Sequence, residues 1–181
     1  MAKLADTAAR VRDTEASTAS AAGETQRRLS RIELPDASPL PSAYADADRR
    51  QAVADLIATN RFDPAGVEHP GPFALHLMVR DGRLILDIRD PGTDAPLRAV
   101  VLALGPFRRL IKDYHLIIES HERAVMEGGH EARIQAIDMG RRGLHNEGAA
   151  LLEQRLGTWI TVDFETARRL FTLVCALHQR I

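Results

Sequence analysis

The chain has 181 residues, of which 45% are hydrophobic, and its 24 basic and 25 acidic residues leave a formal net charge of −1. This length fits a single domain with a sizeable core, and the balanced charge excludes a module that binds nucleic acid through a concentrated basic surface. No stretch reaches the roughly 18 apolar residues of a membrane span, and the N-terminus lacks the apolar region of a secretory signal. We therefore expect a cytoplasmic protein, in which the lone Cys175 stays a buried thiol.

Residues 1–27 are rich in small, polar and charged residues, with Leu4 and Val11 as the sizeable apolar ones. Such a segment buries too little apolar surface to offset the entropy lost on ordering. We predict a disordered tail over residues 1–27 and a single domain over residues 28–181.

The domain is predicted to begin with a short strand at 29–34, which a proline-rich linker follows. Ser42 has the position and chemistry of an N-cap for a helix that extends to about residue 60. The glycines and prolines between residues 63 and 72 indicate a loop.

A β-hairpin is the clearest local prediction. Residues 73–80 and 83–90 alternate between apolar and polar, and the Asp81-Gly82 pair between them favours a tight turn. A two-residue turn places His76 opposite Asp87 on one face, and it sets a register for the other face. The apolar pairs on that face are Val79 with Leu84, Leu77 with Leu86, and Leu75 with Ile88.

The remaining pattern predicts a third strand at 97–104, an edge strand at 158–162, and further helices near 106–127, 131–156 and 164–180. Asp163 is expected to cap the last helix, which is apolar on most sides and should lie at the centre of the core. The fold class is therefore α+β: an antiparallel sheet of three to five strands with about four helices packed on one face.

Three glycines interrupt the helical pattern of residues 131–156, and each would cost about 1 kcal/mol in an unbroken helix. One interpretation is a break at Gly143, with Arg141 and Arg142 in a last helical turn, where cations are favourable. The other is the close approach of a neighbouring helix across Gly140 and Gly148. We favour the break.

Arg108, Arg109 and Lys112 crowd the first turns of the helix predicted at 106–127. Backbone N–H groups already make a helix N-terminus positive, so cations are unfavourable there unless an anion lies among them. These residues are candidate ligands of a phosphate or carboxylate. The alternative is that they form ordinary ion pairs with neighbouring acids.

A second group consists of Asp138, Arg141, Arg142 and His145. In a functional interpretation His145 is a general acid or base, Asp138 orients it and Arg141 holds an anionic substrate. In the alternative, Arg141 only donates hydrogen bonds to carbonyl groups at a helix junction.

His76 and Asp87 form a third group, since a carboxylate beside an imidazole raises the histidine pKa and orients the ring. Cross-strand polar pairs without a function look the same. Residue 125 is valine, so the helix that carries His121 lacks the second histidine of a zinc-protease motif. We expect no metal site and no cofactor.

Residues 105–114, 137–148 and 163–173 together resemble the bacterial uncharacterised protein family zero-two-six-two of the UPF series. The resemblance covers the chain from about Leu29 to the C-terminus and excludes the tail. It implies no activity and no catalytic residues, because the family has none assigned.

The first functional hypothesis is a non-catalytic cytoplasmic binding or regulatory protein with an arginine-lined site for an anionic small molecule or an acidic protein partner. The second is a small hydrolase or transferase that acts on a phosphorylated or carboxylated substrate through a histidine. The third is a structural homodimer with no small-molecule site. An enzyme requires His145, Asp138 and an arginine to converge on one pocket.

Overall fold

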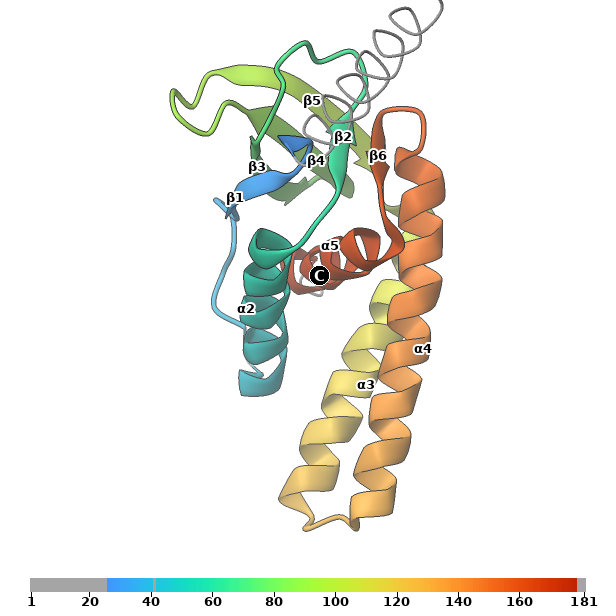
Figure 1. The fold of residues 1–181 in the computed structure, drawn as a ribbon. Coiled ribbons are helices and arrows are strands. Elements are labelled where there is room, and N and C mark those ends of the chain that lie inside the picture. The colour runs from blue at the N-terminus through green and yellow to red at the C-terminus, as the bar shows by residue number, and fades with distance from the viewer. Residues whose placement is uncertain (1–25, 41, 179–181) are drawn as a thin grey trace, which may run out of the picture.

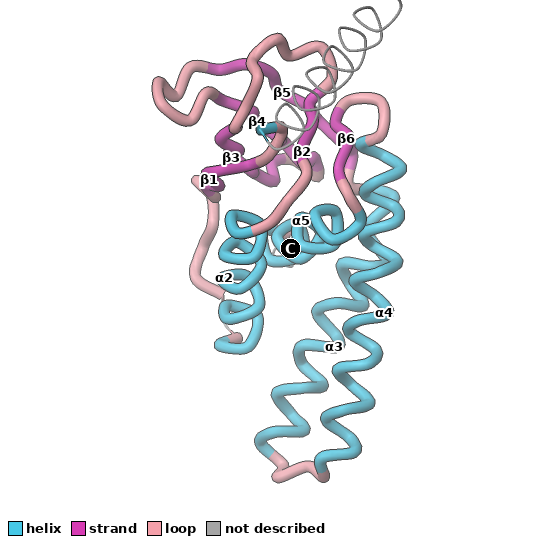
Figure 2. Tube along the Cα trace, viewed as in Figure 1, coloured by secondary structure: helices cyan, strands magenta, loops and turns pink. Residues whose placement is uncertain are grey.

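The computed structural model describes residues 26–40 and 42–178, so the predicted tail lies outside the described residues except for Gln26 and Arg27. A four-stranded sheet and a two-stranded sheet occupy one end of the molecule and the helices lie on one side of them, which confirms the α+β class (Figures 1 and 2). The elements are β1 (Leu29–Glu33), α2 (Ala43–Ala58), β2 (Phe62–Pro64), β3 (Phe73–Arg80), β4 (Arg83–Arg89), β5 (Pro96–Ala103), a short 3-10 helix (Gly105–Phe107), α3 (Arg108–Met126), α4 (Glu131–Leu156), β6 (Ile160–Val162) and α5 (Phe164–Leu177).

The β3–β4 hairpin has the predicted register. Leu77 pairs with Leu86, and His76 pairs with Asp87. Asp81 and Gly82 adopt positive φ angles of 50° and 68°, as a two-residue turn between twisted strands requires. The apolar face of the hairpin is buried and faces the helices.

Two strands pair differently from the prediction. The main sheet has the order β1-β3-β4-β5, and β1 runs parallel to β3 while the other pairs are antiparallel. Parallel pairing needs a long crossover, which α2 supplies between β1 and β3. The predicted edge strand at 158–162 is β6, which joins no edge of the main sheet and pairs with β2, a segment predicted to be a loop.

The predicted break in α4 is wrong, because the helix is continuous from Glu131 to Leu156. The second interpretation holds at Gly148, where an added Cβ would lie 2.3 Å from Cε1 of Phe171 on α5. At Gly140 the nearest atom, Cδ1 of Ile117, would be 3.9 Å away, and Gly143 has nothing within 4 Å. Close packing therefore explains why glycine occupies position 148, but it does not explain the glycines at positions 140 and 143.

Helix α5 is the central core helix, as predicted. Its N-cap Asp163 accepts a hydrogen bond of 2.7 Å from the backbone N–H of Thr166. The helix packs against α2, α4 and β3, and Phe171 and Cys175 are fully buried. Figure 1 shows α5 between the sheets and the long α3–α4 hairpin. Among the described residues, no helix has the length and apolar composition needed to cross a membrane.

Candidate functional site

A cavity of about 200 Å³ lies where α2, α4 and α5 meet, and we call it the interhelical cavity. It contains two of the predicted site residues, Arg141 and His145. Its lining residues are Asp48, Gln51, Ala52, Asp55, Arg141, His145, Arg168, Arg169 and Thr172.

Helical spacing brings these side chains together. Asp48 and Asp55 are seven residues apart on α2 and therefore share one face. Arg141 and His145 are four apart on α4, so they also share a face. Polar side chains from three helices thus meet in one cavity.

Arg141 is a charged residue that is only 19% exposed, and acids of the chain itself pair with it. Its guanidinium donates to Asp48 Oδ1 at 3.0 Å and to Asp138 Oδ1 at 2.8 Å, and it lies over the ring of Tyr44. Burial acts to lower the pKa of Arg141, but the two carboxylates outweigh it and the pKa is raised. Arg141 is therefore a fixed cation in the wall of the cavity.

Asp48 connects Arg141 to the aromatic core. Its Oδ2 accepts a hydrogen bond of 3.3 Å from the Tyr114 hydroxyl and lies 3.9 Å from Nε2 of His145. Burial raises the pKa of Asp48, while Arg141 opposes this shift. Asp48 was not among the predicted site residues, although its position on α2 carries a signal. Asp48 lies on the same helical stripe as the buried Ala45 and Ala52.

His145 is 4% exposed, and its ring stacks on Tyr114 with centroids 5.7 Å apart. Burial, together with the nearby Arg141 and Arg168, lowers the pKa of His145 to about 4, so the imidazole is neutral at physiological pH. Nε2 of His145 neither donates nor accepts a hydrogen bond within the described part of the chain. The acid beside His145 is Asp48, whereas the predicted partner Asp138 pairs with Arg141 and Arg142.

The neutral His145 makes the stability of the protein depend on pH. Because its pKa falls from 6.5 to about 4 on folding, the unfolded chain binds a proton between these values that the folded chain does not bind. We expect this residue alone to lower the free energy of unfolding by about 2 kcal/mol between pH 7 and pH 5. Urea unfolding of the wild type and of His145→Gln at both pH values measures this effect. Equal losses in the two proteins would contradict a buried neutral imidazole.

Two arginines of α5 that were not among the predicted site residues, Arg168 and Arg169, also line the cavity. Arg168 donates to Glu165 Oε2 at 2.7 Å. Arg169 donates through Nη1 to the Thr59 carbonyl at 2.8 Å, and its buried Nε makes no hydrogen bond among the described residues. That Nε lies 3.9 Å from Asp55 Oδ2. The sequence does mark these two residues, because they are adjacent cations on a helix that is otherwise largely apolar.

The other predicted cations lie elsewhere. Arg108, Arg109 and Lys112 are exposed at the start of α3, and none of them lines the interhelical cavity. Arg109 pairs with Asp113 at 3.3 Å and also with Glu147 of α4. Arg142 is 68% exposed and its Nε lies 3.0 Å from Asp138 Oδ2. Of the predicted anion ligands, only Arg141 thus lines the interhelical cavity, where it is partly buried, and the others lie on the surface.

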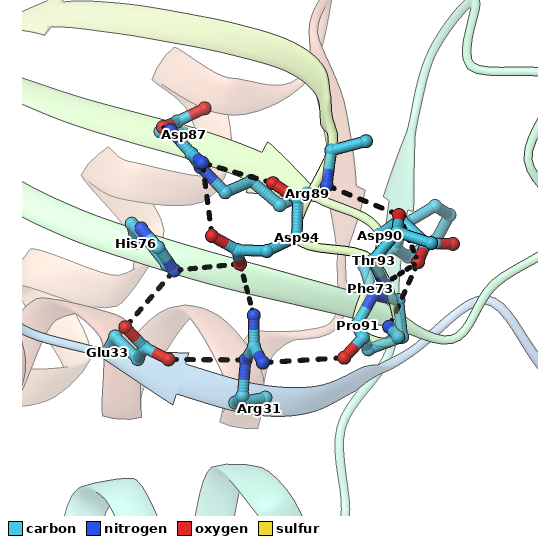
Figure 3. A network of polar contacts seen from close by, with 12 residues as sticks. Arg31, Glu33, Phe73, His76, Asp87, Arg89, Asp90, Pro91, Thr93 and Asp94 are labelled. Carbon is cyan, nitrogen blue, oxygen red and sulfur yellow. Dashed lines mark hydrogen bonds and ion pairs between the residues drawn. The ribbon is translucent and has the colours of Figure 1, made fainter.

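His76 and Asp87 are opposite each other in the register, but their side chains contact other residues (Figure 3). Asp87 accepts from Nε of Arg89 at 2.8 Å. Nε2 of His76 lies 3.3 Å from Glu33 Oε2 on β1 and 3.5 Å from Asp94 Oδ1. The strand at 29–34 was predicted but its parallel pairing with β3 was not, and this pairing places Glu33 beside His76. Among the described residues, no three His, Cys, Asp or Glu side chains are arranged to hold a metal ion.

Fold and site together define an α+β protein with a polar, arginine-containing cavity between three helices. The model of a family described as "Uncharacterised protein family (UPF0262)" matches residues 26–180. The chain therefore belongs to the UPF0262 family, and the resemblance stated from its motifs is confirmed.

Curated relatives carry the same family name. A UPF0262 protein of Granulibacter bethesdensis is 59% identical over 147 residues, which are 77% of this chain and 82% of the relative. UPF0262 proteins of Acidiphilium cryptum and Maricaulis maris are each 53% identical, over 90% and 84% of this chain and 99% and 94% of their own length. No solved structure matches the chain at a significant level.

Proposed function

We propose that the protein is a cytoplasmic, non-catalytic binding or regulatory protein that holds a small anionic ligand in the interhelical cavity. The observation that carries this proposal is that three arginines, Arg141, Arg168 and Arg169, line a cavity of about 200 Å³. Guanidinium groups present planar N–H donors that suit carboxylates and phosphates. A volume of this size suits a metabolite with few heavy atoms, not a macromolecule.

Unsatisfied hydrogen-bonding capacity at the cavity supports a polar ligand. Nε2 of His145 and Nε of Arg169 are buried and lack hydrogen bonds within the described residues. A buried polar atom without a partner costs about 1–3 kcal/mol. A ligand that supplies partners, after small rotations of these side chains, recovers part of this energy on binding.

The second candidate is a small hydrolase or transferase, because Asp48 and His145 lie 3.9 Å apart in the same cavity as the arginines. A general base works best when its pKa is near the operating pH. The pKa of His145 is lowered to about 4, which makes the imidazole a weak base at neutral pH. This property favours binding over catalysis.

A ligand screen on the full-length protein tests the anion site. Small carboxylates and phosphate esters are added, and the melting temperature is recorded. A ligand at about 100 times its Kd adds about 2.7 kcal/mol, which is roughly 5–10 °C for a protein of this size. We expect Arg169→Gln to abolish the shift and the matched surface variant Arg108→Gln to preserve it. Loss of the shift in Arg108→Gln alone would place the site on α3 and contradict the proposal.

A further inference from the structure

The interhelical cavity contains acids as well as arginines. Asp48 and Asp55 line it from α2, and Arg168 and Arg169 line it from α5. A ligand with negative charge only would be attracted by one wall and repelled by the other. We infer that the ligand is a small zwitterion, an acid that also carries an amino group, such as an amino acid. This inference rests on the proposed function and specifies the class of its ligand.

The two acids differ in how far the protein itself neutralises them. Asp48 is 18% exposed and binds Arg141 and the Tyr114 hydroxyl. Asp55 is 42% exposed and accepts a hydrogen bond of 2.7 Å from the neutral Gln51 amide. A carboxylate offers about four acceptor positions, so Asp55 retains capacity for a cationic donor. Asp55 is the residue that faces the ligand's ammonium group.

Arg169 supplies the opposite end of the site. Its Nη1 donates to the Thr59 carbonyl, whereas its Nε makes no hydrogen bond among the described residues. Asp55 Oδ2 and Arg169 Nε are 3.9 Å apart, which is beyond hydrogen-bond length. In an α-amino acid the ammonium and the carboxylate are attached to the same carbon atom. Such a ligand can therefore place its two charges against this adjacent pair of opposite charges.

Size and desolvation agree with this assignment. A cavity of about 200 Å³ has room for a ligand of the size of an amino acid. His145 is 4% exposed, and its Nε2 lacks a hydrogen bond within the described residues, so the inner wall favours a polar ligand.

Matched ligand pairs test the inference on the full-length protein by calorimetry. L-glutamate is compared with glutarate and L-aspartate with succinate, since each pair differs by one amino group. We expect the amino acid of at least one pair to bind at least tenfold more tightly than its partner. Asp55→Asn should remove this preference, because it takes away the acceptor for the ammonium group and one of the charges that repel the plain diacid. Asp46→Asn is the matched control on α2, because Asp46 pairs with Arg49 and does not line the cavity.

The outcomes separate the inference from the proposed function. Equal or tighter binding of the plain diacids would overturn the zwitterion and retain the anion site. A preference for the amino acid that persists in Asp55→Asn would also overturn the inference. If neither these acids nor the carboxylates and phosphate esters of the screen bind, the proposed function itself fails. The comparison on the wild type decides the ligand class even if Asp55→Asn does not fold.

Discussion

The Gly148→Ala variant is expected to be less stable than the wild type by about 2 kcal/mol, whereas Gly143→Ala is expected to be more stable by about 0.5–1 kcal/mol. Both glycines are in the interior of α4, so alanine improves helix propensity at each. At Gly148 the new Cβ would lie 2.3 Å from the ring of Phe171, which is fully buried and cannot move freely. Overpacking of about 3 kcal/mol exceeds the gain of about 1 kcal/mol from propensity.

Urea unfolding of the two variants measures these effects, and each variant is the control for the other. Both variants replace glycine by alanine in the same helix. The difference between their free energies of unfolding therefore reports the environment of the added methyl group. Equal stabilisation by both alanines would mean that α4 and α5 are further apart than the structure places them.

The Arg141→Met variant is expected to lose about 3 kcal/mol of stability. Arg141 and Asp48 are 19% and 18% exposed, and the substitution leaves the Asp48 carboxylate with the Tyr114 hydroxyl as its remaining hydrogen-bond donor among the described residues. Removing one partner of a buried ion pair costs about 3–5 kcal/mol, because the other charge stays buried. We expect the lower end, since the pair is not fully buried.

A double variant and a neighbouring arginine provide the controls. Asp48→Leu in the Arg141→Met background should recover part of the loss, because replacing both members of a buried pair by apolar residues is often neutral. The recovery is incomplete because the buried Tyr114 hydroxyl loses its acceptor. Arg142→Met should cost less than about 1 kcal/mol, since Arg142 pairs with the same Asp138 but is 68% exposed. Equal losses for Arg141→Met and Arg142→Met would contradict the buried character of the Arg141–Asp48 pair.

The parts of the fold that depend on local sequence were predictable. The Asp81-Gly82 turn determined the hairpin register, and Ser42 and Asp163 marked the starts of α2 and α5. The parts that depend on distant partners were not predictable. The reason for Gly148 is the ring of Phe171 on another helix, and no local pattern shows that β1 is parallel to β3.

The candidate site was predictable to the same extent. Arg141 and His145 were found because acidic, basic and imidazole side chains gather between residues 138 and 145, as acid–base chemistry on an anionic substrate would require. The partner that the sequence suggested for His145 was Asp138, seven residues away on the same helix. The structure supplies Asp48 from α2 instead, and it adds Arg169 from α5. Contacts between helices that are far apart in the chain decide which charges share a cavity.

The most direct test of the anion site follows the arginine side chains by NMR while a ligand from the screen is added. Signals of the Nε–H groups are assigned through single Arg→Lys variants. We predict that the signals of Arg141, Arg168 and Arg169 shift in a saturable way. The signals of Arg31 and Arg89, which both pair with Asp94 beside the main sheet (Figure 3), should remain in place. Saturable shifts confined to Arg108 and Arg109, or no saturable shift of any arginine, would contradict a binding site in the interhelical cavity.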